Sequence, residues 1–350
     1  MLSVNSQTGI LYLVIIILTL LSLLLDIFFY PGFCKKHLFI DSRTYIFLFI
    51  TLSLIWSLCN KIKLSPKILS LNKKFIFPSL LILSTLFFFL DGTLYRNFVF
   101  NHFHINTFHF LFLPVLSGTI IYLDFKDLKK YKYIYIIPPL IFLSLIFIHH
   151  ISEDIFGLII NEDGVLEITQ FLMFLASSVI SFLISIKFRA KNKTFSLVFL
   201  LCSISMFFVA GEEISWGQRI LFFSTPEILY EINTQKETTL HNISTIQSAL
   251  SFVYMSIGLY GAFSRKILKR FFPQYFQKYE IFTPPEYLVF CFITIFLYYL
   301  LHDFVFKPFG VWLGNTPIIK WQEVFETFLS IGIVCYFYST LKNLSSSKTN

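Results

Sequence analysis

The sequence predicts an all-α polytopic membrane protein of about ten transmembrane helices. Of its 350 residues, 56% are hydrophobic and 14% are charged, whereas about a quarter of an ordinary soluble domain is charged. The mean hydropathy is +0.72, and the apolar residues gather in long blocks. One globular core cannot bury that much apolar surface. The composition therefore excludes a soluble enzyme, a disordered chain and a secreted disulfide scaffold.

Ten segments are long and apolar enough to be spans, because a bilayer core takes about 20 residues of helix. We expect them to form one integral membrane domain over residues 1–350. The three weakest, 44–60, 75–91 and 133–149, are short and are also compatible with shifted or re-entrant segments. The predicted spans are 8–30, 44–60, 75–91, 107–123, 133–149, 165–187, 195–214, 246–263, 286–305 and 321–340.

The distribution of basic residues predicts the orientation. With ten spans, the connectors alternate between two sides, and 20 of the 28 Lys and Arg residues fall on the side that holds both termini. Cytoplasmic loops are enriched in Lys and Arg. We therefore expect both termini in the cytoplasm and the chain in a bacterial inner membrane.

Acidic residues and histidines gather on the opposite, extracytoplasmic side, with 16 of the 20 acids and all eight histidines. Positive-inside sorting says little about Asp and Glu. The excess of acids and histidines on this side has two possible causes. Either basic residues are avoided there, or a functional site lies on that face. The net charge of +8 is distributed as a membrane protein requires, so we expect membrane lipids as partners and no nucleic acid.

The first polar motif, NEDGVLEITQ, opens the sixth predicted span. Asp163, Glu167 and Gln170 are spaced at i, i+4 and i+7, so they share one helical face. Asp163 is also explained as a first-turn residue, where a carboxylate suits the helix dipole. Glu167 has apolar neighbours instead, and an ionisable group inside a span usually faces a cavity or a partner.

The richest polar motif begins at the end of the seventh predicted span and fills a polar connector, residues 212–245. Glu212 and Glu213 lie in the last helical turn, where the dipole favours cations over acids. Glu212, Trp216 and Arg219 have the spacing of one helical face. Arg219 can neutralise Glu212 or clamp an anionic group, and Trp216 suits an interface anchor as well as a substrate platform.

The second half of the connector is polar after Pro226, with Asn233, Gln235 and Asn242 along it. Glu237 and His241 are four residues apart, so they share a face if this stretch is helical. A connector of this length with so many polar groups is often functional.

The block GEEISWGQR, the TPE that follows it and NTQKETTLHN resemble a family of uncharacterised bacterial multi-pass membrane proteins that share these residues. The resemblance extends to EDGVLEITQ and so covers the middle of the chain. It implies a shared site and no particular reaction.

Other ionisable residues lie at the ends of the last two predicted spans. His302 and Asp303 end the ninth, and Glu323 and Glu326, three residues apart, begin the tenth. All of them map to the depth of the two motifs, so we expect the sixth, seventh, ninth and tenth helices to converge there.

The candidate site residues have three roles. The catalytic set is Glu167, Glu212, Glu213, Arg219, Glu237 and His241, and the substrate-binding set is Trp216, Gln218 and Asn242. A divalent metal is one candidate cofactor, with Glu213, Glu237, His241 and His302 as its ligands, but no HExxH or paired ExxH signature supports it.

Three classes of function remain open. An intramembrane enzyme would act on a lipid or lipid-linked substrate, through a metal-bound water or with Glu213 and Glu167 as acid and base. A proton- or cation-coupled transporter or channel also uses intramembrane carboxylates, although transporter sites tend to lie at the midplane. A non-catalytic assembly or sensor protein would use the same groups as a structural network.

Overall fold

The computed structural model describes residues 78–82, parts of 137–148, 152–161, 164–303 and 321–346. The chain divides into two units, residues 1–153 with 306–318 and residues 154–305 with 319–350. The second unit holds both polar motifs and nearly all of the described helices. Whether the chain is one integral membrane domain stays a prediction.

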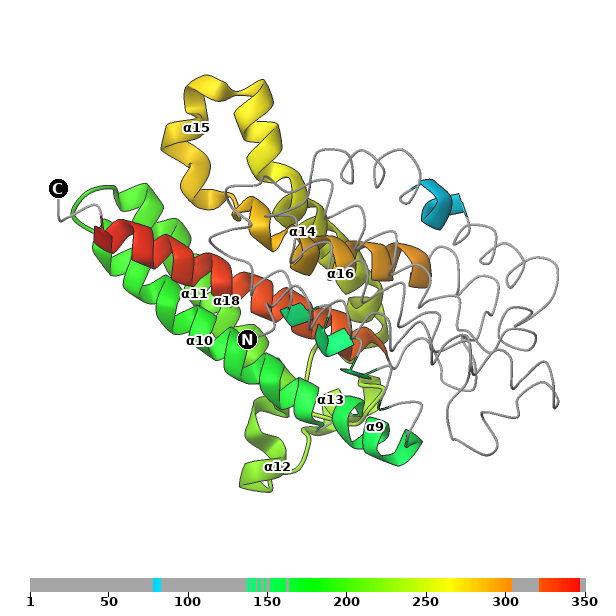
Figure 1. Cartoon of the computed structure of the whole chain (residues 1–350). Helices are drawn as coiled ribbons and strands as arrows, with labels where there is room; N and C mark the ends of the chain where they lie inside the picture. The colour runs from blue at the N-terminus through cyan, green and yellow to red at the C-terminus, as the bar shows by residue number, and fades with distance from the viewer. Residues whose placement is uncertain are drawn as a thin grey trace, which may run out of the picture. The chain divides into compact units, whose positions relative to one another are not determined.

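The described part of the second unit is helical, without a strand, and its only β-type pairing is an antiparallel bridge between Asn233 and Ile243. Its long helices are α10 (Val165–Phe188), α11 (Lys193–Glu213), α14 (Ser244–Phe271), α16 (Val289–Leu301) and α18 (Gln322–Ser346), shown in Figure 1. Its short elements are α9 (Glu153–Ile160), η3 (Ser215–Gly217), α12 (Gln218–Leu221), α13 (Glu227–Ile232), α15 (Pro273–Tyr279), η4 (Glu280–Phe282) and η5 (Glu286–Leu288).

Several helices are long and apolar enough to cross a membrane. Among the described residues, four pass that test alone, namely Asp154–Phe188, Lys193–Glu213, Ser244–Phe271 and Gln322–Ser345. A fifth candidate is the pair Pro273–Phe282 and Glu286–Leu300, which is bent by 54°. The bend falls at Pro284 and Pro285, because proline cannot continue a helix. The described residues therefore confirm a helical protein with several helices long and apolar enough to span a membrane.

These segments coincide with the last five predicted spans, from 165–187 to 321–340. The structure corrects some of their ends. Helix α14 continues eight residues past its predicted end, and Lys269 and Arg270 lie in its last turn, where cations suit the helix dipole. The first five predicted spans, from 8–30 to 133–149, lie outside the described residues except for short helical pieces.

The long helices pack in the order α11, α10, α18, α16, α14. Helices α10, α11 and α18 run side by side, as Figure 1 shows. A short turn joins α10 to α11, and the Asn192 side chain caps α11 by accepting a hydrogen bond from the Phe195 N–H at 3.1 Å. This order brings the beginnings of α10, α14 and α18 to the same end as the last turns of α11 and α16.

Serine side chains join α10 to α11. The Ser178 hydroxyl donates to the Ser203 carbonyl at 2.9 Å, Ser181 donates to the Phe199 carbonyl at 2.7 Å, and Ser185 donates to the next turn of α11 in the same way. Small residues let membrane helices approach closely, and hydroxyl groups that bond across the interface hold them there.

Glycines serve the same purpose between α14 and α16. A Cβ on Gly258 would lie 2.7 Å from the Phe292 carbonyl oxygen, and one on Gly261 would lie 2.2 Å from the Phe292 ring. Both positions therefore need glycine for the close approach of the two helices. The polar motifs are positioned by this tight packing.

Replacing Ser181 by leucine should weaken the α10–α11 contact. Ser181 is fully buried, and a larger side chain there forces the helices apart, which costs about 1–3 kcal/mol. Thermal unfolding of the purified protein in detergent should show a lower melting temperature. Val179→Leu is the matched control, because Val179 is exposed on α10. Equal melting temperatures for the two variants would contradict the packing argument.

Candidate functional site

The Glu212 carboxylate holds the connector against the end of α11. Its Oε1 accepts a hydrogen bond from the Trp216 indole N–H at 2.7 Å, and its Oε2 accepts from the backbone N–H groups of Leu240 and His241 at 2.7 and 3.0 Å. The His241 Nδ1 lies 3.3 Å from the same oxygen. Glu212 is 6% exposed, so a buried charge is matched by donors on several sides. These contacts make Glu212 a structural anchor.

Three consecutive left-handed residues turn the chain after α11. Ser215, Trp216 and Gly217 have φ angles of 48°, 56° and 76°, a conformation that is costly for residues with a Cβ. The turn brings the Trp216 ring against α11, where a Cβ on Gly211 would lie 2.8 Å from it. Gly211 is therefore the residue that lets the indole reach Glu212.

The turn overturns one expectation from the sequence. Glu212, Trp216 and Arg219 do not share a face of one continuous helix, because α11 ends at Glu213. The contact between Glu212 and Trp216 forms through the left-handed turn instead. Arg219 lies in α12, and its side chain falls outside the described part of the structure.

Residues 233–243 form a loop that side-chain amides close. The Asn233 Oδ1 accepts from the Gln235 N–H at 2.8 Å, and its Nδ2 donates to the Thr239 carbonyl at 2.7 Å. The Asn242 amide donates to the Gln235 side chain. This stretch is not helical, so Glu237 and His241 do not share a helical face. The buried Asn242, predicted to bind substrate, is held inside the loop.

Gln218 and Glu237 link the loop to the start of the connector. The Gln218 Oε1 accepts from the Thr238 N–H at 2.8 Å, while its Nε2 donates to the Thr225 hydroxyl at 2.7 Å. The Glu237 Oε2 accepts from the Ser215 hydroxyl at 2.8 Å. The described contacts of these candidate residues therefore hold the connector together.

Glu213 lies next to the anchor and has different surroundings. The carboxyl groups of Glu326, Glu323, Glu167 and Glu212 are all within electrostatic range of it. Its side chain is half-buried, and among the residues that the structure describes no donor forms a hydrogen bond or ion pair with it. The ends of α10, α11 and α18 thus converge on an acidic cluster, which we define as Glu167, Glu213, Glu323 and Glu326.

Neutral donors hold the Glu326 carboxylate. It accepts hydrogen bonds from the Tyr299 hydroxyl at 2.5 Å, from the Gln322 Nε2 at 2.9 Å and from the Tyr254 hydroxyl. Sequence reasoning missed both tyrosines, because the chain is rich in aromatic residues and they do not stand out. Their position in apolar spans could have indicated them, because a buried tyrosine hydroxyl needs a polar partner.

Gln170 connects α10 to the same cluster. Its Nε2 donates to the Glu323 Oε2 at 2.9 Å and to the Glu323 carbonyl at 3.1 Å. Gln170 is fully buried, and no residue in the described part of the chain forms a hydrogen bond with its Oε1. Glu167 lies one turn earlier on α10. Asp163, which the sequence predicts on the same face, lies outside the described residues.

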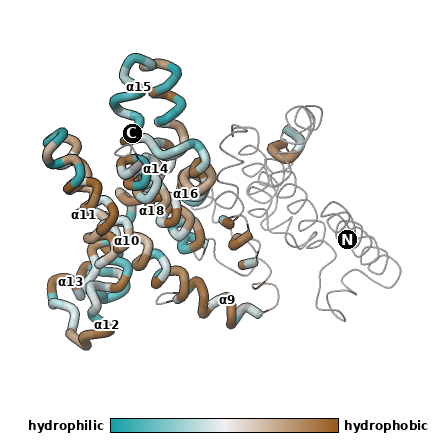
Figure 2. Tube along the Cα trace, turned by 60° about the vertical axis from the view of Figure 1, so that its left-hand side comes forward, coloured by the Kyte–Doolittle hydropathy of each residue, from teal (hydrophilic) through white to brown (hydrophobic). Residues whose placement is uncertain are grey.

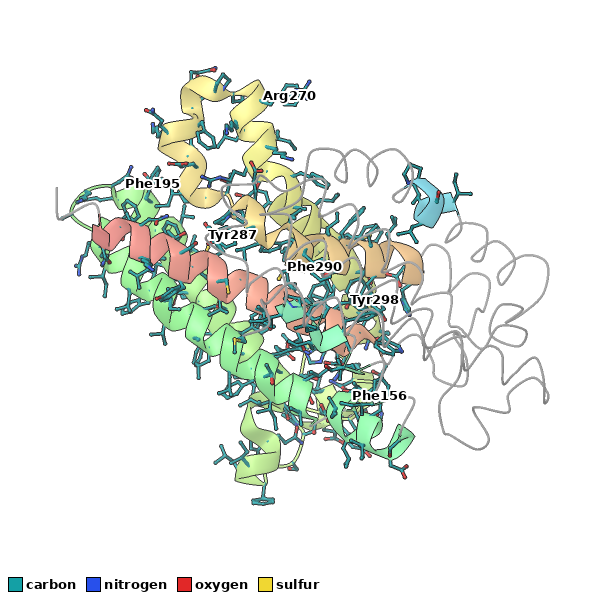
Figure 3. All side chains as sticks on the ribbon, viewed as in Figure 1. Phe156, Phe195, Arg270, Tyr287, Phe290 and Tyr298 are labelled. Carbon is teal, nitrogen blue, oxygen red and sulfur yellow. The ribbon has the colours of Figure 1, made fainter. Side chains whose placement is uncertain are left out.

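His302 and Asp303 lie at the end of α16, close to this cluster. The His302 Nδ1 is 2.8 Å from the Asp303 Oδ1, and its ring stacks on Tyr298 with centroids 5.6 Å apart. Tyr298, labelled in Figure 3, lies where α16 meets α18 and stacks on Phe325. The last turn of α16 therefore packs against the start of α18, next to Glu326.

The candidate metal ligands do not gather around one point. Within the described ranges, no three His, Cys, Asp or Glu side chains form a group that could hold a metal ion. His241 belongs to the Glu212 anchor, whereas His302 pairs with Asp303. The ligand set Glu213, Glu237, His241 and His302 stays a prediction from the sequence alone.

Comparison with known proteins gives no match to this chain among family models, curated proteins or solved structures.

Glu212→Gln should release the connector from α11. The new amide N–H₂ would face donors, and each buried donor left unsatisfied costs about 1–3 kcal/mol. Hydrogen exchange of residues 233–243 should become roughly tenfold faster or more, which mass spectrometry of the purified protein measures. Glu213→Gln is the neighbouring control and should leave this exchange unchanged. Slow exchange in Glu212→Gln would show that Glu212 does not anchor the loop.

Proposed function

We propose that this chain is a multi-pass protein of a bacterial inner membrane, with about ten spans, cytoplasmic termini and an acidic site at the extracytoplasmic interface. The Lys and Arg distribution supports the orientation. We further propose that the site is that of an intramembrane enzyme acting on a lipid or lipid-linked substrate. The resemblance of the GEEISWGQR and EDGVLEITQ blocks to bacterial membrane proteins fits this location and names no reaction.

The contrast between Glu212 and Glu213 carries the proposal. Glu212 uses both oxygens in structural contacts, whereas Glu213 is half-buried among four carboxyl groups and no described donor binds it. Like charges crowded together oppose folding unless protons or a ligand neutralise them. A cluster kept at that cost is typical of a working site.

The chemistry that suits this arrangement is proton transfer. Glu213 and Glu167, from α11 and α10, are the proposed acid and base. Glu326 is fixed by three neutral donors and Glu323 by Gln170, so these two residues set the charge and hydrogen bonding around the reacting pair. We therefore place Glu237, His241, Gln218 and Asn242 in the support of the connector.

Exposed apolar side chains beside the acidic cluster favour a lipid substrate. Ile168, next to Glu167, and Phe208 near the end of α11 are 52% and 43% exposed. In a membrane, such apolar surfaces on a span contact lipid. A lipid molecule would therefore reach the acidic cluster from the bilayer, without crossing the polar connector.

Glu213→Gln should abolish this activity and leave the protein in the membrane. The test compares the lipids of host membranes that hold no copy, the wild type, Glu213→Gln or Glu231→Gln, by untargeted mass spectrometry at matched protein amounts. Glu231 is an exposed carboxylate on α13 and is the matched control. We expect a lipid species that changes with the wild type and Glu231→Gln, and returns to the empty-host level with Glu213→Gln.

No lipid difference between the empty host and the wild type would contradict the enzyme proposal. An equal loss with Glu231→Gln would contradict the assignment of Glu213.

Proton- or cation-coupled transport is the second candidate. It is favoured by the neutral character of the groups that bind Glu326, since a carboxylate without a fixed countercharge can exchange a proton or a cation. Proteoliposomes under an imposed ion gradient would then show flux that Glu213→Gln removes and Glu231→Gln retains. The absence of flux together with a lipid change would leave the enzyme as the function.

A further inference from the structure

The connector carries an apolar tip, residues Ile220–Phe223, that packs against little of the protein. Ile220 and Leu221 are each 70% exposed, and Phe222 is 91% exposed. Figure 1 shows α12 projecting away from the other helices, and Figure 2 colours the end of this projection as hydrophobic. Water is a poor environment for a contiguous group of large apolar side chains.

Hydrogen bonds hold together the two ends of the segment that carries the tip. The Gln218 side chain donates to the Thr225 hydroxyl at 2.7 Å, which joins the two ends of the segment that carries the tip. The Thr225 hydroxyl in turn donates to the Lys236 carbonyl at 2.7 Å. Phe222 has a left-handed φ of 55°, which is unfavourable for a bulky residue. The chain thus adopts a costly conformation in which this ring points outward.

The tip continues the apolar surface of a membrane helix. Phe208 on α11 is 43% exposed, and the Trp216 ring packs edge-on against it with centroids 5.3 Å apart. Trp216 is itself partly exposed and lies four residues before the tip. The chain therefore passes from an apolar contact on the side of the span to the tip within four residues, and tryptophan is enriched where a membrane meets water.

The sequence of the tip also suits lipid better than a protein surface. After Arg219 the chain reads ILFFSTPE, without a basic or acidic residue before Glu227. Ile228, one residue further along on α13, is 77% exposed. An apolar segment that is joined to a span and followed by polar residues is the composition of an interfacial membrane element.

We propose that the apolar tip is inserted into the edge of the lipid bilayer beside α11, so that the connector lies against the membrane surface with its tip in lipid. This inference concerns the connector and does not rest on the proposed function. It assigns residues Ile220–Phe223 to a lipid contact and the loop at residues 233–243 to the aqueous side.

The test places a fluorophore at single cysteines in the full chain after its five native cysteines are replaced by alanine. The labelled variants are Phe222→Cys at the tip, Ile204→Cys on the exposed face of α11 as the lipid reference, and Glu231→Cys on α13 as the aqueous reference. Each variant is reconstituted in liposomes, where quenching by nitroxide-labelled lipids is compared with quenching by iodide in the buffer. Ile220→Cys repeats the measurement if Phe222→Cys does not fold.

We expect the label at residue 222 to be quenched by the lipid nitroxide at least half as strongly as the label at residue 204, and at least fivefold less by iodide than the label at residue 231. Iodide quenching equal to that at residue 231 would show a tip in water and overturn the proposal. Protection from both quenchers would also overturn it, because the tip would then be covered by protein.

Discussion

The rest of the site depends on the hydrogen bonds that the Glu212 carboxylate accepts. It joins two parts of the chain that are 28 residues apart, because it accepts a hydrogen bond from the Leu240 N–H. The same carboxylate binds Trp216 and His241. Ser215 and Gln218 also bind the loop at residues 233–243, but among the described contacts Glu212 is the α11 residue that joins this loop to the helix itself. The left-handed turn after α11 is needed for it, since a continued helix would carry Trp216 and the connector elsewhere. The anchor thus fixes where the connector begins and what lies beside Glu213.

The convergence of helix ends gives the site its chemistry. The packing order α11, α10, α18, α16 brings the ends of these helices together, and the carboxyl groups near their ends meet as a consequence. The acidic cluster has neutral donors on Glu326 and Glu323, while Glu213 is left without a described donor. A structural network would pair its members, as Glu212 is paired. Glu213 therefore differs from its neighbour in the way that a reacting group differs from a supporting one.

Helices were easier to predict from the sequence than contacts. Long apolar blocks gave the positions of the described spans, and the common depth of Glu167, Glu213 and Glu326 indicated that their helices meet. The turn at Trp216 could not be predicted, because a left-handed tryptophan contradicts residue preferences. The partners of Glu212 were hidden for another reason: backbone N–H groups leave no pattern in a sequence. Tyr254 and Tyr299 were overlooked in a chain with abundant aromatic residues.

Thermal unfolding of the two neighbouring glutamine variants tests the central claim most directly. The account predicts that Glu212→Gln lowers the melting temperature of the purified protein by several degrees, because buried donors lose their acceptor. It predicts that Glu213→Gln melts at or above the wild-type temperature, because one of several crowded like charges is removed. A fall for Glu213→Gln as large as that for Glu212→Gln would contradict it, since both residues would then be structural.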